Sequence, residues 1–186
     1  MSLIDKTYFI GEINLPGLQN SDNVDALTVF IQKYEQRYLQ QALGYPLWKL
    51  FNASYNPGPA KGRFLILQEG AEFTNDKGWV NLWTGLTNTE LLSPIANYIY
   101  YWYTRDNVTF TSTIGEVKSN SENSQNADAM IKQMRAYNEM VDQTELLRDF
   151  LKYAVDGDGN ILFPEWEVDN PSSKRQAFKF EKITFF

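Results

Sequence analysis

Apolar side chains recur at helical spacing in three parts of the chain, and this pattern predicts three long helices. The expected ranges are about 24–43, about 89 or 93 to 105, and about 127–154. Gly44 suits the left-handed residue that ends the first helix, so residues 45–51 are expected to form a separate short helix. The pattern therefore favours a mostly α fold, a helical bundle of three main helices.

A small β-hairpin is expected between the first and second long helices. The run Phe64–Leu67 is apolar, Asn75–Gly78 is a turn signal, and Trp79–Trp83 follows with strand-forming residues. The hairpin is therefore placed within residues 63–86.

Polar sequence separates the second and third long helices. Val108, Phe110 and Ile114 lie there at even spacing, so a short strand pair is expected around Gly115. The run 119–126, rich in Ser, Asn, Glu and Gln, is expected to be a mobile loop.

Both ends of the chain have the pattern of extended terminal arms attached to a central domain. Residues 1–20 are expected to form an N-terminal arm, and residues 21–155 the helical domain. Residues 156–186 are expected to be a C-terminal extension, in which Phe178 and Phe180 alternate with charged residues as in an edge strand or an arm. Such arms can pair with a sheet or lie on a neighbouring subunit.

The second long helix is unusual because the segment Tyr98–Tyr103 is apolar or aromatic on every face. A helix of this kind is normally covered on all sides. Aromatic residues make up 15% of the chain, and they are favoured at protein interfaces because they bury large areas. Two explanations stay open at this point: one large core, or contact with a second subunit.

Composition narrows the chemistry that the chain can perform. It has neither cysteine nor histidine, which removes thiolate nucleophiles, imidazole and thiolate metal ligands, and the usual proton shuttle. We therefore expect no enzymatic activity, no cofactor and no metal. The net charge of −6 does not supply the basic footprint that holds DNA, although an acidic surface could line a passage through which DNA slides. The N-terminus has no signal-peptide pattern, so synthesis in the cytoplasm is expected.

The segment Asp156–Ile161 resembles part of a calcium-binding EF-hand loop. Asp156 and Asp158 would take the third and fifth positions of that loop, and Glu165 the twelfth. Ala154 stands at the first ligand position, however, and it has no side-chain oxygen. Asp-Gly sequences also form ordinary turns, which is the interpretation we favour, with an EF-hand-like calcium-binding module as the alternative.

A second alternative is a carbohydrate-binding protein in which Trp79 and Trp83 stack on sugar rings. Tryptophan is more often a core or interface anchor. Carboxylate pairs such as Glu139 with Asp142 also occur, but exposed helix faces explain them without any acid–base role.

A likeness to a known family lies in three stretches of the chain. They are Phe30–Leu39 leading into Leu43–Leu47, then Leu91–Tyr101, and then Thr113–Val117 with the polar run and long helix that follow. These stretches resemble the head–tail connector (adaptor, or head-completion) proteins of tailed bacteriophages, in the form found in phages and prophages of Bacteroidetes. The resemblance covers about residues 24–155 and consists of the order of the helices and of loosely matching residue patterns, without an invariant catalytic motif. It implies a helical subunit that forms an oligomeric ring beneath the portal.

We therefore predict a phage virion structural protein of the neck, made in the bacterial host cytoplasm, that acts by assembly and not by catalysis. Its expected partners are copies of itself in a ring, the portal, and neighbouring tail or neck proteins. DNA is expected only as passing cargo, and no membrane is involved. The residues expected at protein interfaces are Tyr98, Trp102, Tyr103, Phe110, Ile114, Phe178 and Phe180.

Overall fold

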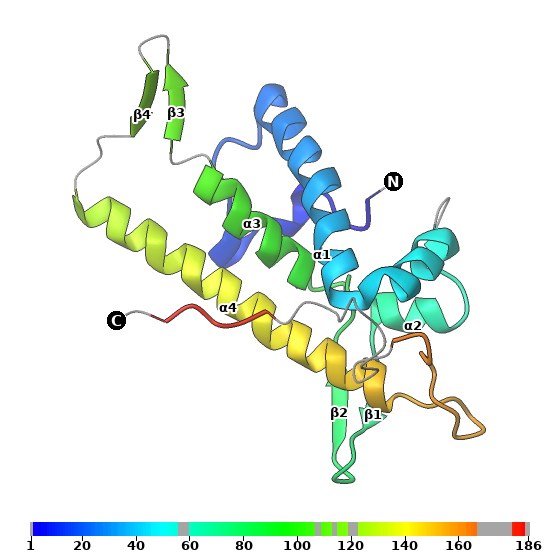
Figure 1. Ribbon diagram of the computed structural model, residues 1–186. Helices are drawn as coiled ribbons and strands as arrows, with labels where there is room; N and C mark the ends of the chain where they lie inside the picture. Colours follow the sequence, from blue (N-terminus) through cyan, green and yellow to red (C-terminus); the bar gives the residue numbers. More distant parts are fainter. Residues whose placement is uncertain are drawn as a thin grey trace.

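The computed structural model describes residues 2–55, 60–106, 109–112, 115–118, 123–166 and 180–184, and for those between 109 and 129 it gives the backbone only. In chain order the elements are η1 (Lys6–Tyr8), η2 (Gly11–Ile13), α1 (Ser21–Tyr55), α2 (Arg63–Glu69), β1 (Ala71–Thr74), β2 (Val80–Trp83), α3 (Pro94–Asp106), β3 (Thr109–Ser112), β4 (Gly115–Lys118) and α4 (Asn123–Tyr153). Figure 1 shows α1, α3 and α4 packed as a bundle, with the β1–β2 hairpin projecting from it. The predicted mostly α fold with a small hairpin is confirmed.

Helix α1 contains a bend at Gly44, where φ is 71° and ψ is 156°. Glycine tolerates a positive φ because it has no Cβ, and Pro46 suits the first turn of the helical half that follows. The predicted helices 24–43 and 45–51 are thus the two halves of one element, which extends further at both ends. Beyond the bend, the second half turns toward α2 (Figure 1).

The core lies where α1 and α4 pack against α3. Each helix contributes fully buried apolar side chains, including Leu27, Ile99 and Met140. Tyr38 of α1 is also fully buried, and its hydroxyl group lies 2.8 Å from the hydroxyl oxygen of Thr144 in α4. Burial raises the pKa of the Tyr38 phenol, so this group stays a neutral hydrogen-bonding partner in the core.

The segment 64–67 is helical, so its assignment to the first hairpin strand was wrong. A run of four apolar residues fits a buried strand and a helix equally well. Here it belongs to α2, which ends at Gly70, whose φ is 100° and whose N–H donates to the Ile66 carbonyl. The hairpin forms just beyond, where β1 pairs antiparallel with β2 and Thr74 faces Val80 across the predicted turn.

The base of the hairpin is anchored on the bundle. Trp83 is fully buried, its indole N–H donates to the Leu67 carbonyl at 2.9 Å, and its ring stacks on Phe150 of α4. The chain then passes so close to α2 that a Cβ at Gly85, whose φ is 91°, would lie 2.5 Å from the Gln68 carbonyl oxygen. These contacts fix where the hairpin leaves the body.

The N-terminal arm is not extended, as had been expected, but forms the two short 3-10 helices η1 and η2. Asp5 caps η1 by accepting a hydrogen bond from the Thr7 backbone N–H at 2.8 Å. Ile4, Phe9 and Leu15 are buried in the same core as the long helices. The arm therefore packs on its own chain.

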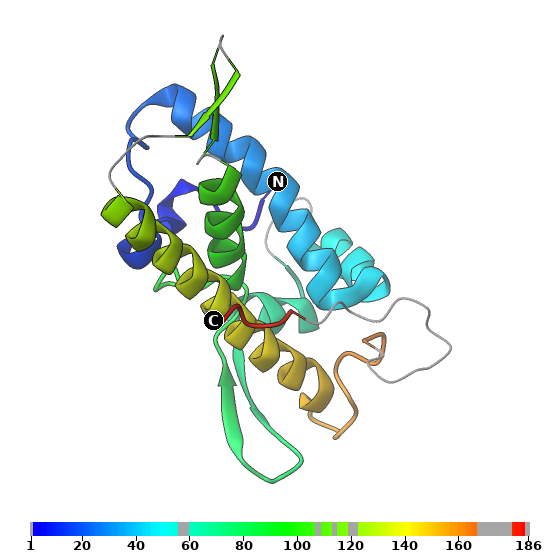
Figure 2. The same ribbon diagram turned by 60° about the vertical axis from the view of Figure 1, so that its left-hand side comes forward.

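The strand pair predicted around Gly115 is confirmed as β3 with β4, in which Phe110 faces Val117. In the polar run 119–126, which was predicted to be a loop, residues 123–126 are helical because α4 begins at Asn123, and residues 119–122 lie outside the described residues. At the C-terminal end, residues 180–184 have no strand partner and lie across α4 (Figures 1 and 2), so the predicted edge strand is not formed there.

Candidate functional site

The EF-hand-like segment does not gather its carboxylates around one point. Asp156 accepts hydrogen bonds from the backbone N–H groups of Asn160 (2.9 Å) and Asp158 (3.0 Å), and these bonds hold its pKa below the ordinary value. Glu165 instead pairs with Arg63 at 2.7 Å, and that hydrogen bond lowers its pKa. Within the described ranges, no group of three or more acidic, Cys or His side chains could hold a metal ion.

The two tryptophans of the carbohydrate hypothesis have opposite environments. Trp83 is fully buried, whereas Trp79 is 65% exposed at the end of the hairpin turn. A platform for sugar stacking needs exposed ring faces, so these two residues do not form one together.

Two of the predicted interface residues are core residues of the protomer. Tyr98 and Phe180 are 2% and 4% exposed, and their rings meet edge to face with centroids 5.9 Å apart. The chain itself covers both rings, so neither lies on a surface that is open to a partner. Three further predictions fall where the structure gives no side chain: Phe110 is described by its backbone only, and Ile114 and Phe178 lie outside the described residues.

The remaining two, Trp102 and Tyr103, are half-buried in the last turns of α3. The Trp102 ring stacks on Tyr34 of α1, with centroids 5.8 Å apart. The guanidinium groups of Arg37 and Arg105 each lie 5.2 Å from its centroid. Trp102 therefore has partners within the protomer and only part of its surface open.

An uncovered apolar face lies on the β1–β2 hairpin. Val80 and Leu82 are two residues apart in β2, point to the same side, and are 68% and 57% exposed. Trp79, 65% exposed, lies next to Val80 at the turn, but the same alternation places it on the side of Asn81 and Trp83. Both views show the hairpin projecting away from the helices (Figures 1 and 2). Adjacent exposed apolar side chains on a projection are typical of a protein-binding surface. We call Val80 and Leu82 the hairpin face.

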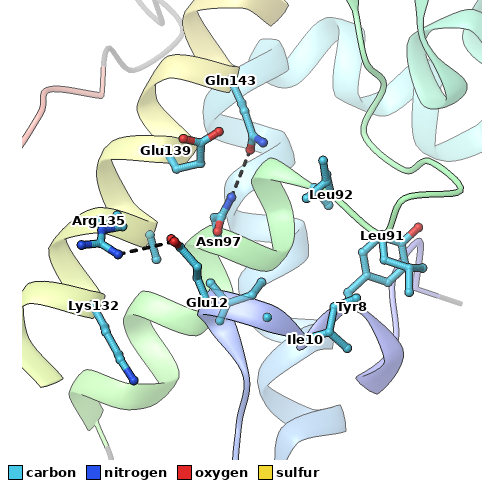
Figure 3. Close-up of a pocket in the computed structure, with 14 residues that line it drawn as sticks. Tyr8, Ile10, Glu12, Leu91, Leu92, Asn97, Lys132, Arg135, Glu139 and Gln143 are labelled. Atoms are coloured by element: carbon cyan, nitrogen blue, oxygen red, sulfur yellow. Dashed lines mark hydrogen bonds and ion pairs between the residues drawn. The ribbon is translucent and has the colours of Figure 1, made fainter.

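A hollow of about 450 Å³ lies elsewhere on the protomer, between η2, the start of α3 and the middle of α4 (Figure 3). Its apolar lining is Ile10, Ile13, Leu91, Leu92 and Ala136, of which Ile10 and Leu92 are exposed. We call these five residues, with the charged rim described next, the hollow.

Charged side chains surround the opening of the hollow. Glu12 and Arg135 form an exposed ion pair at 3.4 Å, and Lys132 and Glu139 lie beside it. Deeper inside, the Asn97 side-chain amide donates to the Gln143 amide oxygen at 3.2 Å (Figure 3). An apolar floor with charges of both signs at the rim suits an apolar side chain from another protein that carries its own flanking charges.

Strained backbone borders this hollow. Leu91 has a φ of 58° and is the one non-glycine residue with a positive φ in the part of the chain that the structure describes. A non-glycine residue in this conformation costs about 1–3 kcal/mol and persists when its surroundings hold it. Asn88 does so, since its side chain accepts from the Leu92 N–H at 2.9 Å and its carbonyl from the Leu91 N–H at 3.2 Å. The strain presents Leu92 at the opening of the hollow.

A buried carboxylate, Glu35 of α1, holds the N-terminal arm. Both of its oxygens accept hydrogen bonds from the Leu3 N–H, at 2.9 and 3.1 Å, and Oε2 also accepts from the Ile4 N–H at 3.3 Å. Burial outweighs these bonds and raises the pKa of Glu35 to about 7. A smaller hollow of about 280 Å³ adjoins it, lined partly by Trp48 and Tyr55. Glu35 thus has a structural role in fixing the arm that carries η2.

Sequence reasoning did not find the exposed residues of these surfaces. Alternation along residues 79–83 predicts two faces of a strand but not which face the bundle covers. No sequence pattern predicted the hollow, because Ile10, Leu92 and Ala136 come from three distant segments that only the fold brings together.

No protein-family model matches the sequence, and no curated protein or solved structure matches it significantly. Among the described residues, no helix is both long enough and apolar enough to cross a membrane.

Proposed function

We propose that this protein is a virion structural protein, a head–tail connector (adaptor) subunit of a tailed bacteriophage that assembles with copies of itself into a ring under the portal. One observation carries the proposal: a single protomer has an uncovered apolar projection, the hairpin face, and an uncovered apolar hollow on different elements. The hairpin face projects and the hollow is concave, so the two apolar surfaces are complementary in shape.

In the proposed assembly, the hairpin face of one copy packs over the hollow of the next copy. Such a contact is heterologous, because each copy uses two different surfaces, and heterologous contacts generate rings when the rotation between copies closes. Charge supports the pairing. Asp76 and Lys77 lie in the hairpin turn next to Trp79, and they can meet the rim cations and carboxylates of the hollow.

Two features of the sequence support the same function. The resemblance to connector proteins extends over about residues 24–155, which includes most of α1 and all of α3 and α4. The net charge of −6 suits a ring that lets DNA pass without holding it, because neutralising phosphates requires a basic surface.

The virion assignment is tested with phage particles. The protein is expected to remain in purified virions, and deletion of its gene is expected to yield DNA-filled heads without tails. Absence from purified particles, or normal tailed particles after deletion, would refute the assignment.

The assembly contact is tested by sedimentation velocity on the purified chain. Val80→Lys is expected to weaken self-association at least about tenfold, because burying a valine side chain contributes roughly 1.5 kcal/mol or more, and a lysine there would have to be desolvated. Val29→Lys is the matched control, since Val29 is 64% exposed on α1, outside both surfaces, and should have little effect.

A mixing experiment then distinguishes two different surfaces from one symmetric surface. Leu92→Lys is expected to weaken association through the hollow as Val80→Lys does through the hairpin. A mixture of the two variants retains one intact hairpin and one intact hollow, so it should form dimers and stop there. The proposed contact is contradicted if Val29→Lys weakens self-association as much as Val80→Lys does. It is also contradicted if the mixture of Val80→Lys and Leu92→Lys fails to dimerise.

A further inference from the structure

Residues 180–184, here called the strap, cross α4 (Figures 1 and 2) and contact a surface formed by side chains of α1, α3 and α4. Phe180 packs against two rings that also contact each other, with centroids 5.6 Å apart. It stacks on Tyr38 with centroids 5.8 Å apart and meets Tyr98 edge to face at 5.9 Å. Tyr38 and Tyr98 thus bind one aromatic side chain from a segment far along the sequence.

Polar contacts with α4 fix the register of the strap. The Asn138 side chain accepts from the Ile183 N–H at 2.8 Å and donates to the Ile183 carbonyl at 3.0 Å, as a neighbouring strand would. Lys182 forms an ion pair with Asp142 at 2.7 Å, and two more carboxylates of α4 add to the attraction. We call Tyr38, Tyr98, Asn138 and Asp142 the strap groove, which recognises an aromatic ring, a backbone segment and a cation in fixed order.

The strap is joined to the preceding described residue by a long stretch of sequence. Residues 167–179, which lie outside the described residues, join Trp166 to Phe180. The Trp166 indole N–H donates to the Ala42 carbonyl, and Phe180 stacks on Tyr38, so the side chains at both ends of this stretch contact neighbouring turns of α1. A chain of this length can reach roughly 43 Å at ~3.3 Å per residue. A strap on a stretch of this length can exchange with any copy whose binding surface lies within that reach.

We propose that the strap groove is also an intermolecular docking site, filled in an assembly by the strap of a neighbouring copy. The inference rests on the self-assembly proposed above and adds a means of tying neighbouring copies together. The same contacts form within one chain and between two chains, so exchange is close to neutral in contact energy. In an isolated chain the tether favours the strap's own groove, whereas in an assembly a neighbour's groove is held at a comparable effective concentration.

The Lys182–Asp142 ion pair allows a test on the unaltered chain. A carbodiimide joins a carboxylate and an amine that are in direct contact, so it converts this ion pair into an amide bond. Unlabelled and nitrogen-15-labelled copies are mixed, unfolded and refolded together, concentrated until assembled, coupled and digested. Mass spectrometry is expected to detect Lys182–Asp142 linked peptides with one labelled and one unlabelled half, up to half of all linked peptides when exchange is complete.

Controls separate this inference from the proposed function. Lys182→Arg keeps the charge but removes the coupling amine, so the linked peptide must disappear. If the sample is assembled but every linked peptide carries a single label state, strap exchange is refuted and the ring proposal stands. Mixed peptides in a sample that forms only dimers support strap exchange and contradict the ring. A sample that neither assembles nor gives mixed peptides refutes both.

Discussion

Replacing the buried carboxylate of Glu35 by an amide tests how the N-terminal arm is held. Glu35 is the residue whose two oxygens accept the backbone N–H groups of Leu3 and Ile4. Burial raises its pKa from 4.5 to about 7, which means that between these two pH values the folded state retains a proton that the unfolded chain has largely released. Glu35→Gln removes this titration and retains a side chain of similar size and one acceptor oxygen.

The sign and size of the effect follow from this difference in proton binding. A raised carboxylate pKa means that the folded state is fully favoured below about pH 4.5 and loses stability as the pH rises to about 7, above which the loss is complete. At ~1.4 kcal/mol per pKa unit, the loss amounts to about 3 kcal/mol. The chain has no histidine, so no imidazole titration overlaps this window.

Urea unfolding at pH 5, 6, 7 and 8 measures the effect. The unaltered chain is expected to lose about 3 kcal/mol of unfolding free energy across this range, and Glu35→Gln is expected to show a nearly flat profile. Glu90→Gln, at an exposed position, is the matched control and should follow the unaltered chain. An unchanged pH profile in Glu35→Gln would refute the reasoning.

Two further predictions concern the hairpin base and the acidic turn. Gly85→Ala is expected to lower the free energy of unfolding by about 2 kcal/mol or more in urea unfolding, because φ is 91° and the new Cβ would lie 2.5 Å from the Gln68 carbonyl oxygen. Gly157→Ala meets open space and is the control, so equal losses would contradict this account. Calorimetric titration with calcium at sub-millimolar concentration is expected to give no binding heat, because Arg63 holds the Glu165 carboxylate at 2.7 Å; a clear binding isotherm would overturn the turn assignment.

The long helices were predictable because each carries a stripe of buried side chains over several turns. In α4, Met140, Leu147 and Leu151 are fully buried and recur at helical spacing. The errors lie in short segments. Four apolar residues at 64–67 contain too little periodicity to separate strand from helix, and the N-terminal arm depends on burial against α1 that no local pattern shows.

The candidate surfaces were less predictable, since exposure depends on contacts between distant parts of the chain. Tyr98 was predicted to lie at an interface because of its aromatic character, but Phe180 covers it from the far end of the sequence. On the hairpin, residue type alone would favour Trp83 over Val80 as a contact residue. The bundle covers the face of β2 that carries Trp83 and leaves Val80 open.

Phe180 also has a consequence for how a new copy matures on the ribosome. Translation runs from the N-terminus, so Tyr38 and Tyr98 emerge well before the Phe180 ring that packs against both. At ~5–20 residues per second, several seconds separate the synthesis of Tyr98 from that of Phe180. Every nascent chain therefore passes through a stage in which its core lacks one aromatic ring, and the speed of translation sets how long that stage lasts.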